Sequence, residues 1–381
     1  MDGPLHGLRV IEIAAIGPAP MACMLLSDLG ADVVRIDRPE PSGLGLALAP
    51  QHDVTARGRR SVVLDLKSAA GQAAALRLIA QADVLIEGFR PGVMEALQLG
   101  PDACRTLNAG LVYGRMTGFG QSGPLAAAAG HDLNYLALSG ALHAIGPAGG
   151  APLPPLNLVA DYGGGALYLA FGVMAALYER QRSGRGQVVD AAMVDGAASL
   201  ASLFYGLQAA GQWHEARGSN LLDGGAPFYG VYACADGRFI SLAPLEPKFF
   251  AQLVRALAID PTFVPRQYDR QAWPALRDAI ASAVRSASRQ QWQERLEGTD
   301  VCFAPVLTFD EAPQHAQARA RQSFVDIGGV VQPAPAPRFD RTPAALPQRA
   351  PRQGEHTAEV LQAAGFSADE IGSLMGSGGT R

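Results

Sequence analysis

Short apolar runs alternate with helical patterns through the first third of the chain. The predicted strands are residues 8–13, 32–36, 61–65, 84–87 and 111–116, and the predicted helices between them include 21–29 and 68–80. Strands that are separated by helices pair in parallel through right-handed crossovers. The pattern therefore predicts an α/β fold with a doubly wound, mostly parallel, Rossmann-like sheet.

The pattern changes after this sheet. Long helices are predicted at 162–181 and 193–207, and a hairpin at 228–242 turns around Asp236-Gly237, a strong two-residue turn signal. Further helices are predicted at 247–257, 271–286, 289–296 and 357–364, while the proline- and alanine-rich stretch 332–351 predicts an extended strap. We therefore expect a large α/β domain with long helices at 1–221 and a small α+β domain at 222–320. Residues 321–381 would form the strap and a C-terminal helix that returns to the large domain.

Composition narrows the class of protein. The 381 residues are 48% hydrophobic and 17% charged, with a formal net charge of −4. This balance argues against a nucleic-acid partner, which would require a basic face, and against bulk disorder. The four cysteines form no CxxC pair, so neither a metal site nor a disulfide framework is predicted.

No leader precedes the first strand, and the longest apolar stretch, 156–177, is interrupted by Asp161 and lacks basic flanks. A buried helix is therefore favoured over a membrane span. We expect a cytoplasmic protein without a membrane partner.

A literal GxGxxG motif stands at 118–123, directly after a predicted strand. A dinucleotide fingerprint opens a helix, but Pro124 and an alanine run follow here. A loop at the surface or beside a site is favoured over a dinucleotide site. Arg38 and Arg90 follow predicted strand ends, where α/β sheets bind ligands. They are candidate phosphate contacts, with solvated surface charge as the alternative.

Three further residues are candidates for chemistry. His131 lies in the polar segment 130–135, and Asp161 stands at the start of a long apolar helix. The alternative for Asp161 is an N-cap, but the three glycines after it each cost up to ~1 kcal/mol in a helix. Close approach of a ligand to the backbone would offset that cost. Glu246 precedes Pro247, so helix capping is its alternative too.

The chain resembles the type III CoA-transferase (CaiB/BaiF-like) family and, within it, the α-methylacyl-CoA racemases. The matching segments are 16–18 (IGP), 29–35 (LGADVVR), 60–67 (RSVVLDLK), 89–92 (FRPG), 118–123 (GFGQSG), 130–135 (GHDLNY), Asp161 with its glycines, 184–187 (GRGQ), 223–229 (DGGAPFY) and 246–247 (EP). They follow one another over most of the chain, which makes coincidence a poor explanation.

The resemblance implies an interlocked homodimer whose active site lies between the large, CoA-binding domain of one subunit and the small domain of the other. It implies an acyl-CoA substrate, with CoA as part of the substrate and no separate cofactor. The residues that the resemblance assigns to the CoA thioester are Arg38, Leu64, Asp65, Leu66, Lys67, Arg90, Gly130, Asp132, Leu133, Asn134 and Tyr135.

A racemase of this kind removes the α-proton of a 2-methylacyl thioester on one face and returns a proton on the other, which requires two acid/base groups. The resemblance implies His131, supported by Glu246, on one face and Asp161 on the other, where a desolvated carboxylate would have a raised pKa. The enolate oxygen also needs a donor. Backbone N–H groups near His131 and Asp132, or at the glycine-rich helix start, are the candidates.

Two other functions stay open. In a true CoA-transferase the residue corresponding to Asp161 is a nucleophile that forms an acyl anhydride and then a CoA thioester. Such an enzyme does not need His131 and Glu246 as a proton-handling pair, so their presence favours the racemase. A non-catalytic CoA-ester-binding protein is the third reading. The acyl group stays open as well.

Overall fold

The computed structural model describes residues 3–40, 43, 45 and 48–377 of the chain. The chain divides into two compact units. The first unit comprises Met1–Ser139, Pro155–Ala201 and Gln317–Arg381, and the second comprises Gly140–Pro154 and Ser202–Ala316. Each unit has its own hydrophobic core.

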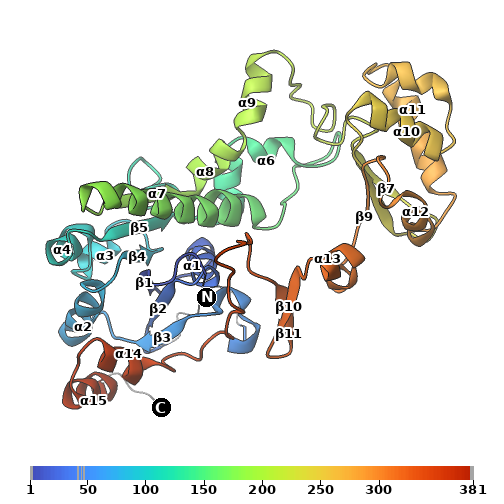
Figure 1. Ribbon diagram of the computed structural model, residues 1–381. Coiled ribbons are helices and arrows are strands. Elements are labelled where there is room, and N and C mark those ends of the chain that lie inside the picture. Colours follow the sequence, from blue (N-terminus) through green and yellow to red (C-terminus); the bar gives the residue numbers. More distant parts are fainter. Residues whose placement is uncertain (1–2, 41–42, 44, 46–47, 378–381) are drawn as a thin grey trace. The chain divides into compact units, whose positions relative to one another are not determined.

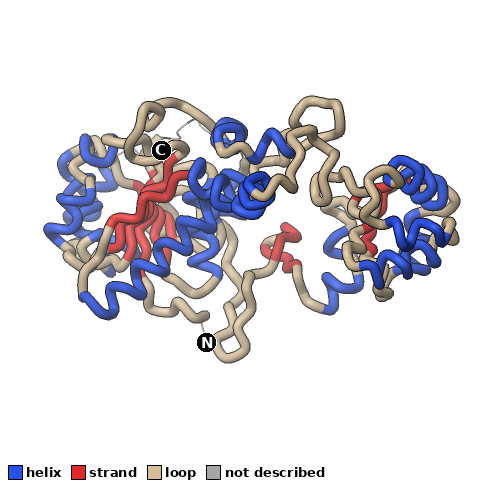
Figure 2. The backbone as a smooth tube through the Cα atoms, turned by 90° about the horizontal axis from the view of Figure 1, so that it is seen from above, coloured by secondary structure: helices blue, strands red, loops and turns tan. Residues whose placement is uncertain are grey.

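The first unit is built on a six-stranded parallel sheet with the order β3-β2-β1-β4-β5-β6. Its strands are β1 (Arg9–Ile13), β2 (Asp32–Asp37), β3 (Arg60–Val63), β4 (Val84–Glu87), β5 (Val112–Thr117) and β6 (Val188–Ala192). The order reverses direction between β1 and β4, the switch point at which such sheets bind ligands. Figure 2 shows the strands side by side with helices along both faces. The predicted doubly wound α/β class is confirmed, although β6 was not predicted.

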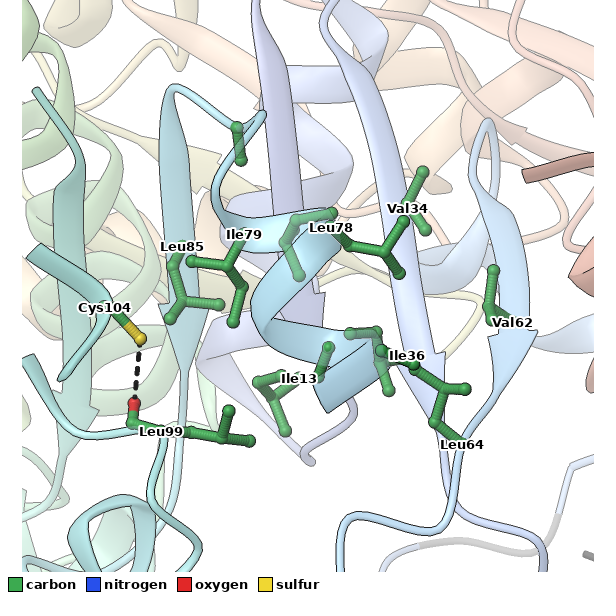
Figure 3. Packing of buried hydrophobic residues seen from close by; sticks show 14 of the residues in the cluster. Ile13, Val34, Ile36, Val62, Leu64, Leu78, Ile79, Leu85, Leu99 and Cys104 are labelled. Atoms are coloured by element: carbon green, nitrogen blue, oxygen red, sulfur yellow. Dashed lines mark hydrogen bonds between the residues drawn. The ribbon is translucent and has the colours of Figure 1, made fainter. Parts of the chain in front are cut away.

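Helices cover both faces of this sheet (Figure 1). They are α1 (Pro18–Asp28), α2 (Ala69–Ile79), α3 (Val93–Ala96), α4 (Pro101–Leu107), α5 (Asp132–Leu138), α7 (Tyr168–Ser183) and α8 (Met193–Leu200). On one face, Leu78 and Ile79 of α2 pack against strand residues that include Ile13, Ile36 and Leu85 (Figure 3). Burying one such side chain stabilises the folded state by about 1.5–3 kcal/mol.

The C-terminal segment closes the β3 edge of the sheet. The N–H of His356 donates to the carbonyl of Ser61 (2.9 Å), and the N–H of Val63 donates to the Thr357 hydroxyl (3.1 Å). Helices α14 (Thr357–Ala363) and α15 (Ala368–Ser377) follow. An edge strand with free N–H groups is a template for unwanted pairing, so these bonds protect the sheet.

A hairpin of β10 (Phe324–Ile327) and β11 (Val330–Pro333) occupies the start of the predicted strap. The buried Arg57 fixes it to the sheet domain. Its guanidinium donates to Gln332 Oε1 (2.9 Å) and to the carbonyl of Pro333 (2.7 Å), and Nε donates to Asp28 Oδ1 (3.0 Å).

The predicted helix 162–181 begins differently in the structure. Residues Leu158–Leu167 form a π-helix, η3, which continues into α7. Glycines let η3 contact α8 backbone to backbone, because a Cβ on Gly196 would lie 1.9 Å from the carbonyl oxygen of Gly164. The glycines after Asp161 therefore serve helix packing, and the expected close approach of a ligand to them is not needed to explain their presence.

The second unit contains an antiparallel sheet of β7 (Gly230–Ala233), β8 (Phe239–Leu242) and β9 (Phe303–Pro305). Its helices are α6 (Ala141–Ala144), α9 (Ser202–Ala209), α10 (Pro247–Ala256), α11 (Trp273–Val284) and α12 (Arg289–Leu296), and the short α13 (Ala316–Ala320) follows β9. The predicted hairpin is confirmed, with Gly237 at φ +72° in its turn. The predicted helix 193–207 is wrong as one element, because it divides at Ala201 into α8 and α9.

The compact units differ in extent from the predicted domains. Residues 140–154 and 202–221 belong to the second unit, and 317–381 belong to the first. It stays a prediction that the chain forms three domains at 1–221, 222–320 and 321–381.

One helix among the described residues, Leu158–Ser183, is long and apolar enough to cross a membrane by length and composition alone. A single helix of this kind is weak evidence for a span, since core helices pass the same test. One face of it packs on the sheet domain through Leu169, Val173 and Leu177. The opposite face carries an exposed apolar stripe formed by Leu167, Phe171, Met174 and Tyr178.

The Gly164–Gly196 contact can be tested by adding one methyl group. In Gly196→Ala the new Cβ must displace the η3 backbone. Such overpacking typically lowers the free energy of unfolding by about 1–3 kcal/mol, so the thermal unfolding midpoint should fall by roughly 2–10 °C. The matched control is Gly372→Ala in α15, where a Cβ meets nothing within 4 Å and the midpoint should stay or rise. A Gly196→Ala midpoint equal to that of the wild type would contradict the packing role.

Candidate active site

The predicted CoA contacts lie in the first unit, at the carboxyl ends of its strands. Arg38 follows β2, residues 64–67 follow β3, and Arg90 follows β4. Arg38 and Arg90 are exposed, and no described residue forms an ion pair with either guanidinium. Both cations are therefore available to an anionic ligand at this edge.

His131 and Asp161 are joined through the residue between them in the fold, Asp132. His131 is the N-cap residue of α5, and its N–H donates to Asn134 Oδ1 (3.0 Å). Asp132 is only 7% exposed, and its Oδ1 accepts the N–H groups of Ala160 (2.9 Å) and Asp161 (2.8 Å). Charge-assisted bonds of this kind are about twice as strong as neutral ones. The start of α5 and the η3 segment are thus fixed to each other.

This link was not foreseen from the sequence, in which Asp132 was assigned to the CoA thioester by resemblance. The interpretation of Asp161 as an N-cap is wrong, because Asp161 lies inside η3 and Asn157 precedes the helix. The N–H groups of Ala160 and Asp161, near the start of η3, are bound by the Asp132 carboxylate. An acidic residue next to the candidate histidine was the signal available in the sequence.

The Asp161 carboxyl group is half-buried. Burial raises its pKa above the ordinary aspartate value, and the nearby Asp132 charge raises it further. A hydrogen bond from Asn157 Nδ2 to Oδ2 (3.2 Å) and the charge of His131 act in the opposite direction. A carboxyl group with a raised pKa is better suited to donate a proton as well as accept one.

The GxGxxG loop serves the site by leaving room for Tyr135. A Cβ on Gly118 would lie 2.1 Å from the Tyr135 ring, and one on Gly130 would lie 2.7 Å from it. The ring meets Phe119 edge to face at 4.9 Å. Burial and the Asp161 charge raise the pKa of Tyr135 to about 12, while Arg90 acts in the opposite direction. No helix follows the motif directly, so the prediction of a loop in place of a dinucleotide-binding helix start agrees with the structure.

The other predicted contacts differ in what they can offer a ligand. Lys67, Leu133 and Asn134 are exposed. Asp65 Oδ1 accepts the N–H of Lys67 (3.0 Å) and so shapes the turn after β3. The Leu64 side chain is part of the hydrophobic core, and Leu66 packs against that core, so main-chain atoms are what Leu64 retains for a ligand.

Glu246 lies in the second unit, at the N-cap position of α10. Glu246 thus has the predicted cap position, with Pro247 as the first helical residue, but its exposed side chain makes no capping hydrogen bond. The turn before it is well fixed, because Gln267 Nε2 donates to the carbonyls of Pro244 (3.0 Å) and Leu245 (2.9 Å). The Tyr268 hydroxyl also donates to Leu245. The carboxylate is thus presented on a rigid turn.

Among the described residues, no group of three His, Cys, Asp or Glu side chains is arranged to bind a metal ion. The four cysteines are free thiols, three of them buried. The site combines an imidazole, a carboxyl group with a raised pKa and exposed cations. This combination suits proton transfer or nucleophilic attack on an anionic ester.

Comparison with known proteins agrees with this chemistry. Residues 5–357 match the CoA-transferase family III. The chain is 47% identical over 369 residues to an alpha-methylacyl-CoA racemase of Mus musculus, which covers 96% of this chain and 95% of that protein. It is 31% identical over 397 residues to a succinyl-CoA–D-citramalate CoA-transferase of Chloroflexus aurantiacus, covering 98% of this chain and 97% of that protein.

The fold has a close counterpart among solved structures. A CAIB/BAIF family protein from Brucella suis superposes with a TM-score of 0.81 at 26% identity, covering 96% of this chain and 100% of that one. Family match, near full-length relatives and shared fold lead to one conclusion. The chain belongs to the CoA-transferase family III.

Proposed function

We propose that this protein is a racemase of 2-methylacyl-CoA thioesters. The observation that carries the proposal is the link through Asp132, which fixes Asp161 of η3 to the residue next to His131. Two different acid/base groups on one frame are what a 1,1-proton transfer requires. The 47% identity to a racemase, against 31% to a transferase, supports the same choice.

The proposed reaction uses the two groups in turn. One of them takes the α-proton as the C–H electron pair moves into the enolate, whose negative charge rests on the thioester oxygen. The other gives a proton to the opposite face of the same carbon. His131 and Asp161 then stand in exchanged protonation states, and the reverse turnover restores them. The raised pKa of Asp161 suits it to both roles.

The enolate oxygen requires a hydrogen-bond donor, typically worth ~3–4 kcal/mol. The N–H of His131 donates to Asn134, and those of Ala160 and Asp161 donate to Asp132. The N–H of Asp132 has no acceptor among the described residues. We therefore assign the oxyanion contact to the Asp132 N–H, next to His131.

The proposal extends to an interlocked dimer in which Glu246 of one subunit supports His131 of the other. Glu246 is exposed and bound by none of the described side chains, so its carboxylate is free for an imidazole. The apolar stripe on the helix Leu158–Ser183 has large exposed side chains, with Phe171 74% exposed. Such a face needs a cover, and a second copy of the chain supplies one. A cytoplasmic location stays a prediction.

A CoA-transferase is the second candidate, because the family contains transferases and Asp161 could act as their nucleophile. Asp161 would then attack as its carboxylate, and no imidazole on the opposite face of the substrate would be needed. The link through Asp132, which fixes Asp161 to the residue next to His131, favours proton transfer.

Isotope exchange separates the two functions. A single epimer of a 2-methylacyl-CoA incubated in D₂O should racemise and gain one α-deuterium without any acceptor acid. A transferase would instead leave the epimer unchanged until a free carboxylic acid is added. Strict dependence on such an acid would overturn the racemase proposal.

The roles of the two groups can be separated by single substitutions. His131→Ala should reduce α-proton exchange from one epimer by ~10²- to 10⁴-fold, the usual contribution of a general acid/base, and Asp161→Ala should do so for the other epimer. The measurement is α-deuterium uptake from each pure epimer. His315→Ala, in an ion pair with Glu297, is the control and should match the wild type. Full activity of either site variant removes that residue from the mechanism.

The dimer is tested by charge on the apolar stripe. Phe171→Asp should convert a dimer into monomers in sedimentation equilibrium and abolish racemisation, because Glu246 would no longer reach a partner. Phe309→Asp, at a side chain that is 91% exposed on a loop, is the matched control and should stay dimeric. A wild type that sediments as a monomer would exclude the shared site.

A further inference from the structure

The loop of residues 88–92 contains one of the two arginines expected to bind the CoA phosphates and contacts the other, and its role as inferred here rests on the proposed function. It leaves β4 at the switch point of the sheet and contains Arg90. Its Phe89 ring lies beneath the guanidinium of Arg38, 5.6 Å from the ring centroid. The loop therefore controls both candidate phosphate-binding arginines.

Both ends of this loop are bound by one buried side chain, Arg115 of β5. Glu87, which ends β4, pairs in register with Arg115, so the two side chains share a face of the sheet. Arg115 Nε donates to Glu87 Oε1 (2.9 Å). Its two terminal nitrogens donate to the Glu95 carboxylate of α3 at 2.7 and 3.2 Å. Glu87 precedes the loop and Glu95 follows it.

The connection continues from Glu87 into the loop itself. The second carboxylate oxygen of Glu87 accepts the N–H of Phe89 (2.7 Å). That bond orients the residue whose ring lies under Arg38. One chain of hydrogen bonds therefore runs from Arg115 through Glu87 to Phe89.

The charges suit a positioning role better than a stabilising one. Glu87 is fully buried, and replacing a buried ion pair by apolar residues is often neutral or stabilising. Glu95 is 45% exposed, and an ion pair at such a position contributes little to stability. These charges therefore add little to the stability of the fold. Their contacts instead restrict the conformation of the 88–92 loop, which contains Gly92 at φ +87°.

The ionisation of Glu87 depends on the same contacts. Burial raises its pKa to about 7, the nearby Glu95 charge raises it as well, and the Phe89 N–H and Arg115 lower it. Tyr113, with its own pKa raised by burial, also faces this group from β5. Loss of Arg115 would therefore favour the neutral acid, a poorer acceptor for the Phe89 N–H.

We propose that Arg115 is a positioning residue for the nucleotide end of the CoA ester. By binding Glu87 and Glu95 it fixes the ends of the 88–92 loop, and so places Arg90 and the Phe89–Arg38 pair where the phosphates bind. It touches neither the acyl group nor the reacting carbon. Its loss should weaken CoA binding and leave the chemical step unchanged.

Binding of free CoA tests this without reference to catalysis. In Arg115→Lys the charge remains, but an ammonium cannot reach both carboxylates with the fixed fork of a guanidinium. Titration calorimetry should give a Kd about tenfold above that of the wild type. Glu95→Ala, at an exposed position where folding is not at risk, should raise Kd about threefold.

The matched control is Arg180→Ala. Arg180 forms an ion pair with Asp83 (2.9 Å) and donates to the carbonyl of Gly110 (3.1 Å), at the opposite ends of the same two strands. Its CoA affinity should equal that of the wild type. The positioning role would be overturned if the wild type and the three variants bound CoA with equal affinity. It would also be overturned if Arg180→Ala lost as much CoA affinity as Arg115→Lys.

A truncated substrate gives the second readout. With 2-methylacyl-CoA, Arg115→Lys should raise KM about tenfold at an unchanged kcat. With the same acyl group on N-acetylcysteamine, which has no phosphates, both constants should match the wild type. A KM increase on both substrates would overturn the proposal by indicating general damage. CoA binding without racemisation in the wild type would refute the proposed function alone, and absence of CoA binding would refute both.

Discussion

The carboxylate of Asp132 is the contact on which the site depends. It is nearly excluded from water and accepts two backbone N–H groups from a segment 28 and 29 positions later in the chain. A buried carboxylate without such donors would cost several kcal/mol. The requirement to satisfy it therefore forces the start of α5 against η3. His131 and Asp161 lie near each other because of this contact.

The π-helical geometry of η3 is the second constraint. A π-helix is rare, and π-helical segments are frequently found at functional sites. Here Gly164 and Gly196 allow η3 to contact α8 with no side chain between the backbones. Because α8 follows β6 directly, the contact fixes η3 to the sheet. Asp161 is thus placed by backbone packing on one side and by Asp132 on the other.

Different loops at the carboxyl ends of the strands carry the cations and the acid/base groups. Loops after β2, β3 and β4 present the exposed cations, and the segment after β5 leads to the acid/base pair. Beneath them, buried charges such as Arg115 connect neighbouring loops instead of meeting a ligand. This division is compatible with more than one reaction on a CoA ester, since the cations serve any of them. The groups near the thioester carbon decide which reaction occurs.

Local pattern was sufficient for the strands β1 to β5, the turn at Gly237 and most helices of the second unit, because alternation, helical period and turn residues depend on near neighbours. Local context also marked His131, Asp161 and Glu246 as candidates, and the resemblance supplied their roles. Sequence could not reveal the π-helix, the break at Ala201 or the second role of Asp132. Each of these arises from contact between residues far apart in the chain, and tertiary packing alone decides which buried polar groups meet.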